Sequence, residues 1–177
     1  MAMTLITTND GSGVATSDFT SGIDSTYKLY IFKFIDVNPV TDGAEFGFQA
    51  NVATASGFDE TMTTSYFGAF HNEADSDAYV QYFVNFDQAQ GTGYQDLMTN
   101  VGNGADESCA GTLWLFNPSN TTYVKHFYFT GATYAEGDGM HNSYVAGYFN
   151  VTGAIDEVSF KMSSGNMDAV IKMYGVG

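Results

Sequence analysis

The sequence predicts an all-β protein, an antiparallel two-sheet sandwich of jelly-roll-like form, with a closed barrel as the second choice. The first reason is composition, because Thr, Val, Phe, Tyr and Ile together number 65, whereas Leu, Glu, Gln, Lys and Arg number 21. β-Branched and aromatic side chains fit a pleated sheet but lose χ1 freedom in a helix. The second reason is spacing, because strand-like runs recur between turns rich in Gly, Asn and Asp, as in sandwiches and barrels. One domain, residues 1–177, is expected.

The N-terminal part is predicted to form two short strands, residues 4–8 and 14–20, around a Gly-rich turn. A longer strand follows at residues 27–37, and its return strand is expected at residues 45–52. The side chains on both faces of the long strand are largely apolar or aromatic. A sheet with one wet face should instead alternate cleanly between apolar and polar residues. We therefore expect a central strand covered on both sides, by another sheet or by a neighbouring subunit.

The middle of the chain is less regular. Residues 61–70 are predicted as a strand, but residues 77–87 fit two structures. Their aromatic residues follow the i, i+3, i+4, i+7 spacing of a short amphipathic helix, whereas their Tyr, Phe and Val content favours a strand. Residues 91–107 are rich in Gly, Asn and Asp, which predicts a long surface loop with an apolar contact at Leu97 and Met98.

The last third is predicted to return to regularly spaced strands, at residues 111–116, 122–130, 143–152, 154–162 and 167–174. Turn-forming residues separate several of them, at residues 117–120, 136–139 and 163–166. No linker, internal repeat or low-complexity block interrupts the chain. This regular spacing supports the sandwich.

The charge balance argues against two classes of partner. The chain has 20 acidic residues, no arginine, and a net charge of −15. Its five cations are spread along the sequence, at Lys28, Lys33, Lys125, Lys161 and Lys172. Phosphate groups are bound by clustered cations, and the field of such an acidic protein repels polyanions. We therefore expect neither nucleic acid nor an anionic membrane as a partner.

Cysteine usage and the N-terminal residues bear on the compartment. Cys109 is the only cysteine, so no internal disulfide can form, and a buried inert thiol is expected. The first residues lack a basic region followed by a long apolar segment, which predicts that there is no signal peptide. No apolar run approaches the roughly 20 residues of a membrane span. The chain is expected to fold where it is made.

No catalytic, cofactor-binding or metal-binding residue is predicted. His126 lies in a strand and is expected to be packed, while His71 and His141 lie beside acidic loops at spacings that do not suit zinc. No G-x-S-x-G motif is present, and acids near Cys109 would raise the pKa of its thiol. Trp114, the only candidate for a sugar-stacking platform, is expected in the core. A glycosidase-like pair of carboxylates stays open only because acids are so numerous.

Two acidic turns, residues 36–42 and 75–77, offer the oxygen ligands that Ca²⁺ prefers. Neither has the spacing of an EF-hand loop, so solvated carboxylates are expected there. The Gly-rich residues 102–107 fit neither a dinucleotide-binding nor a P-loop motif, and are interpreted as a loop.

Several short motifs stand in a characteristic order, at residues 21–30 (SGIDSTYKLY), 38–39 (NP), 41–42 (TD), 102–104 (GNG), 107 (E), 111–118 (GTLWLFNP), 155–158 (IDEV), 163–166 (SSGN) and 171–175 (IKMYG). In this order they resemble a β-rich domain of structural proteins from tailed bacteriophages, including marine ones. The resemblance covers nearly the whole chain and brings no catalytic residues. It implies a virion component assembled in the bacterial cytoplasm, such as a capsid decoration, neck or tail-fibre protein.

The resemblance and the absence of an active-site motif predict a surface-displayed virion structural protein and no enzyme. Its partners would be copies of itself, with a trimer favoured, and other virion proteins. The alternative is a lectin-like module that binds host-surface glycans through exposed Tyr residues on a concave face. A polysaccharide-cleaving enzyme is ranked lowest, and no cofactor is expected.

Overall fold

The computed structural model describes residues 2–177 and confirms the all-β class. Its thirteen strands form one sheet, made of β1 (Met3–Val14), β2 (Ser17–Phe19), β3 (Leu29–Pro39), β4 (Ala44–Val52), β5 (Met62–Asn72), β6 (Ala78–Tyr82), β7 (Ala89–Gly91), β8 (Gln95–Val101), β9 (Cys109–Phe116), β10 (Lys125–Ala135), β11 (Gly139–Phe149), β12 (Ile155–Met162) and β13 (Met167–Val176). Within residues 2–177 the only helix is one 3-10 turn, η1 (Val84–Phe86). The same residues include no helix with the length and apolarity to cross a membrane.

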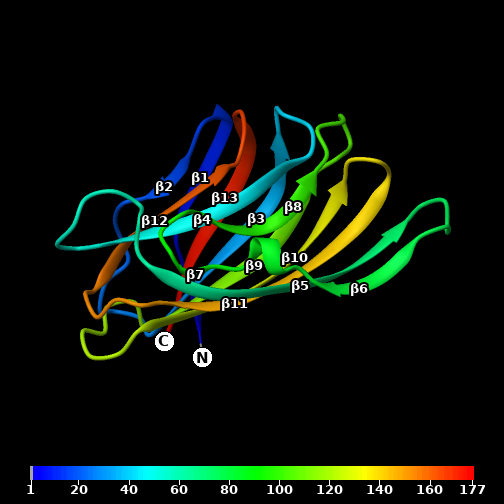
Figure 1. The fold of residues 1–177 in the computed structure, drawn as a ribbon. Coiled ribbons are helices and arrows are strands. Elements are labelled where there is room, and N and C mark those ends of the chain that lie inside the picture. Colours follow the sequence, from blue (N-terminus) through cyan, green and yellow to red (C-terminus); the bar gives the residue numbers. More distant parts are fainter. Residues whose placement is uncertain (1) are drawn as a thin grey trace.

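The sheet is antiparallel throughout and curls into a nearly closed barrel (Figure 1). Its strand order is β1-β13-β3-β9-β10-β8-β4-β12-β2. The remaining strands branch from β10: β11 pairs with β10, β5 pairs with β11, and both β6 and β7 pair with β5. The two ends of this order meet, because the Asn9 side chain of β1 donates to Ser17 Oγ of β2 at 3.2 Å. The seam between β10 and β8 is a single residue pair, Ala135 with Val101. The antiparallel barrel-like form is therefore established, while the jelly-roll arrangement stays a prediction.

Aromatic side chains from opposite walls of the barrel build the core. Phe160 of β12 lies among them, with its ring centroid 5.3 Å from that of Phe32 and 5.0 Å from that of Phe34, both on β3. Phe46 of β4 stacks on the same ring at 6.0 Å and Phe19 of β2 meets it edge-on at 6.0 Å. Since β12 and β3 are not neighbours in the sheet, these contacts join one wall to the other.

The long early strand is central, as expected, because β3 pairs with β13 on one side and β9 on the other. Its inward residues Tyr30, Phe32 and Phe34 are buried. On the outward face, however, Ile31 is only half-buried and Ile35 is 37% exposed. No second sheet of this chain covers that face, so cover by a neighbouring subunit stays a prediction.

The prediction of a long surface loop at residues 91–107 is wrong, because residues 95–101 in its centre form the largely buried strand β8. Leu97 and Met98 are fully buried, as core residues rather than a loop contact. Polar Gln95 is also fully buried, and its side chain accepts from Thr64 Oγ1 at 2.6 Å and donates to the Phe86 carbonyl at 2.9 Å. Gln95 can be buried in this strand because its side chain is hydrogen-bonded.

The ambiguous residues 77–87 combine both expected forms, as strand β6 followed by the single turn η1. The hairpin of β10 and β11 is longer than predicted. β10 runs on to Ala135 and β11 starts at Gly139, inside the predicted turn, so that the turn shortens to residues 136–138. Asp138 has a φ of 58° and Gly137 a φ of 81°, which is the left-handed backbone that a tight hairpin requires.

Candidate functional site

Four neighbouring strands of the sheet contain none of the chain's acidic residues. These are β9, β10, β11 and β5, which pair in that order. Their only formally charged residue is Lys125, whose side chain is fully buried and donates to the carbonyls of Tyr123 and Val151, at 3.0 Å each. Burial lowers the pKa of Lys125. All 20 acids lie on other strands and on loops.

We call the outward side of these four strands the uncharged face. Its larger side chains are Phe67, Trp114, Phe116, Tyr128, Tyr144 and Tyr148. They adjoin across the strands because the register brings them opposite one another: Trp114 pairs with Tyr128, and Tyr144 with Phe67. The ring centroids are 5.3 Å apart in the first pair and 5.0 Å in the second, whose rings are nearly parallel at 9°. The face is therefore a broad aromatic surface without charge.

Two hollows flank His126 at one end of the uncharged face. The larger, of about 540 Å³, is lined by Phe116, Asn117, Asn120, Thr122, Tyr123, Val124, His126 and Thr152. The smaller, of about 380 Å³, is lined by Thr63, Thr64, Ser65, His126, Phe127, Ala146, Gly147 and Tyr148. Both linings combine aromatic rings with hydroxyl groups, and neither includes a carboxylate. Such surroundings suit a neutral ligand better than an ion.

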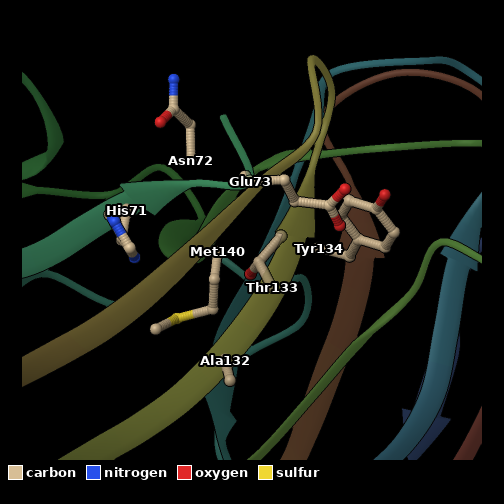
Figure 2. A pocket seen from close by; sticks show the side chains of 8 residues that line it. His71, Asn72, Glu73, Ala132, Thr133, Tyr134 and Met140 are labelled. Atoms are coloured by element: carbon tan, nitrogen blue, oxygen red, sulfur yellow. The ribbon is translucent and has the colours of Figure 1, made fainter. Parts of the chain in front are cut away.

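A third hollow, of about 410 Å³, lies at the other end, where β5 and β10 end and β11 begins (Figure 2). Met140 and Ala132 lie along it, with His71 on one side and Glu73 and Tyr134 on the other. A hydrogen bond to Glu73 and the nearby acids raise the pKa of Tyr134 to about 12. The phenol is thus held protonated and cannot serve as a base near neutral pH.

The three histidines are not brought together. His71 is exposed and pairs with Asp75 at 3.0 Å. His126 is exposed on the uncharged face beside Tyr148, so the expectation of a packed histidine is wrong. The burial of His141 was also missed: rather than lying beside an acidic loop, it is 4% exposed and surrounded by rings, the nearest being Phe70 at 4.9 Å. The two errors have different causes. Alternation along a strand does not say which side faces inward, which explains His126, whereas His141 lies outside the predicted strand 143–152 and inside the observed strand β11.

The other candidates fall as follows. Cys109 is buried, as expected, and burial, not neighbouring acids, raises the pKa of its thiol. Trp114 is half-buried on the uncharged face, which corrects its expected place in the core. For the acidic turns, no group of three or more His, Cys, Asp or Glu residues that could hold a metal ion occurs within residues 2–177.

The aromatic residues of the uncharged face were missed by a search for catalytic motifs. The sequence nonetheless contains a signal for them, because it has long segments without an acidic residue although about one residue in nine of the chain is acidic. No protein-family model, no curated protein and no solved structure matches the chain. The resemblance to phage structural proteins therefore stays a prediction.

Proposed function

We propose that this chain is a non-catalytic structural protein of a bacteriophage particle, of the surface-displayed decoration or fibre type, which assembles through its uncharged face. One observation carries the proposal: four adjacent strands without an acid in a chain of net charge −15. Elsewhere on the surface, contact between two copies would bring carboxylates together. On this face it would not, and burying the aromatic rings would favour association.

The fold supports the same role. We infer that the barrel acts as a two-layer, jelly-roll-like sandwich. One layer consists of β2, β12, β4 and β8, and the other of β1, β13, β3, β9, β10, β11 and β5. The ring contacts of Phe160 and those of Phe48 with Phe127, at 4.8 Å, support this division because they cross between the layers. In this arrangement the uncharged face is the outer side of the larger layer.

Sedimentation equilibrium tests the proposal with a matched pair of variants. Ala146 is exposed in the middle of the uncharged face, beside Tyr128 in the register, and Ala55 is exposed in a loop. The wild type is expected to form an oligomer, with a trimer favoured. Ala146→Glu should weaken the self-association at least about tenfold, because a buried unpaired charge costs more than about 1.4 kcal/mol. Ala55→Glu should leave it unchanged. A wild type that stays monomeric at high concentration would refute the proposal.

The second candidate is a carbohydrate-binding module, favoured by the two hollows beside His126. Tyr123 is 70% exposed at the edge of the larger hollow, and hydroxyl and amide groups lie around it. Sugar rings stack on such aromatic surfaces while their hydroxyls bond to polar neighbours. A glycan array is expected to show binding that Tyr123→Ala abolishes and that Tyr27→Ala, which does not line the hollow, preserves. An array without any signal would remove this candidate.

A further inference from the structure

Strand β6 is a free edge of the sheet. It pairs with β5 on one side only, and the hairpin of β5 and β6 projects from the body of the barrel (Figure 1). All five of its residues are exposed, Val80 by 79% and Tyr82 by 56%. The strand contains no charge and no proline, the two devices that usually protect an edge against pairing.

The hydrogen-bond pattern shows which backbone groups of β6 are free. At the ends of the hairpin, Phe83 N donates to the Tyr66 carbonyl at 3.0 Å and Asn72 N to the Asp77 carbonyl at 3.1 Å. Hydrogen-bonded pairs alternate along an antiparallel ladder. The amide and carbonyl groups of the intervening residues Ala78, Val80 and Tyr82 therefore point away from β5.

The other ends of the sheet, β7, β1 and β2, are less open than β6. β7 also pairs only with β5, but it is three residues long. β1 and β2 lie against each other, since Asn9 donates to Ser17 Oγ at 3.2 Å and to the Asp18 carbonyl at 3.0 Å. Each also carries an acid, Asp10 on β1 and Asp18 on β2. β6 is thus the edge at which the chain can best accept another strand.

We propose that β6 pairs antiparallel with β6 of a second copy, about a two-fold axis at Val80. Because the free groups are arranged symmetrically about Val80, this register forms about six backbone hydrogen bonds. Val80 lies opposite Val80 of the second copy, and the large Tyr82 of each copy lies opposite the small Ala78 of the other. Asp77 falls opposite Phe83, so no acid of the hairpin faces another acid. A partner strand with acidic residues would lack this fit.

The pairing deepens the assembly proposed above and rests on it, because it names an edge through which copies join. Side chains of Ala78, Val80 and Tyr82 share the outward side with His71, Ala69 and Phe67, their partners on β5. The pair would therefore extend the uncharged face from one copy into the next. A trimer built on that face would carry three such edges, each available to a neighbouring trimer.

A charge-swap experiment tests the axis at Val80. In sedimentation equilibrium of the full chain, Val80→Glu and Val80→Lys should each weaken the pairing about tenfold or more, since like charges would meet at the axis. An equimolar mixture of the two should restore it. Val40 is the matched control: it is 63% exposed, directly after β3 and outside the β5–β6 hairpin, and Val40→Glu and Val40→Lys should change nothing. Circular dichroism checks that each variant keeps its strands.

The outcomes separate this inference from the proposed function. If Ala146→Glu disrupts the oligomer and the Val80 variants do not, assembly through the uncharged face stands and the edge pairing is refuted. Failure of the mixture to restore what each Val80 variant loses also refutes the register. If the wild type is monomeric at every concentration, both proposals fall.

Discussion

The inner and outer sides of β9 and β10 have nearly the same apolar character but very different surroundings. On the inner side Leu113, Phe127 and Phe129 are fully or almost fully buried; on the outer side Phe116 is 42% and Tyr128 38% exposed. These residues alternate along the same strands. An apolar residue in a strand therefore indicates that its side chain is covered, but not whether the same chain or another one covers it.

The largest expected effect comes from a substitution on the inner side. Phe160→Ala should lower the free energy of unfolding by about 3–5 kcal/mol, because it removes a buried ring that joins the two walls and leaves a cavity. Phe116→Ala, on the outer side, should cost less than about 1 kcal/mol in the monomer. Urea unfolding measures both. Equal losses would show that the outer side is as much a part of the core as the inner one.

The next effect concerns a buried acid on β8, a strand outside the uncharged face. Burial, with Glu45 nearby, raises the pKa of Asp96 on β8 from 3.8 to about 6. A carboxyl whose pKa is raised by folding destabilises the protein fully above the folded pKa and not at all below the unfolded one. Asp96→Asn should therefore stabilise the fold by about 1–2 kcal/mol at pH 8, after allowance for partial solvent screening, and by nothing near pH 3.5.

The control for this prediction removes the neighbour instead. Glu45→Gln leaves Asp96 buried but takes away the second charge, so it should give a smaller gain in the same pH range. Urea titrations at several pH values measure both variants. A gain from Asp96→Asn that does not change with pH would contradict the assignment to ionisation.

A smaller effect concerns a buried histidine on the inner side of the sheet. Burial lowers the pKa of His141, whose Nδ1 has no hydrogen-bond partner. An imidazole whose pKa is lowered by folding loses stabilising power as the pH falls below its unfolded value near 6.5. Between pH 7.5 and 5 the wild type should lose more stability than His141→Phe.

The exposed ring of Phe116, which carries no titratable group, provides the comparison. The stability difference between wild type and Phe116→Ala should stay constant over the same pH interval. Thermal unfolding followed by circular dichroism suffices for both variants. If the difference between wild type and His141→Phe is also constant, protonation of the buried ring does not limit stability.

The sequence predicted the fold class and the central place of the strand expected at residues 27–37, which the structure places at 29–39, because apolar and aromatic residues dominate both faces of that strand. It failed at β8, since buried Gln95 and Thr99 are satisfied by partners distant in the chain, which composition cannot reveal. The closure into a barrel depends on two small contacts, the pair Ala135 with Val101 and the hydrogen bonds of Asn9 on β1 to β2. Such contacts leave no local signal.

The candidate site was predictable in part. The absence of acids from residues 62–72 and 109–116 can be counted in the sequence, but only the register shows that these strands lie in one stretch of sheet with β10 and β11 between them. The exposure of Trp114 followed from no local rule, because Leu113 and Leu115 beside it are buried and a single shift of register would exchange their places.

The last and smallest effect uses that tryptophan as a reporter of the outer side. Trp114 is the only tryptophan and lies half-buried against Tyr128 on the uncharged face. If a second copy covers this face, indole emission should shift towards shorter wavelength, and acrylamide quenching should fall about twofold, as the protein concentration rises through the range of self-association. Ala146→Glu should show the low-concentration spectrum throughout. An oligomer whose tryptophan is quenched as readily as that of the monomer would place the contact elsewhere, because an indole in the covered area cannot stay equally accessible to solvent.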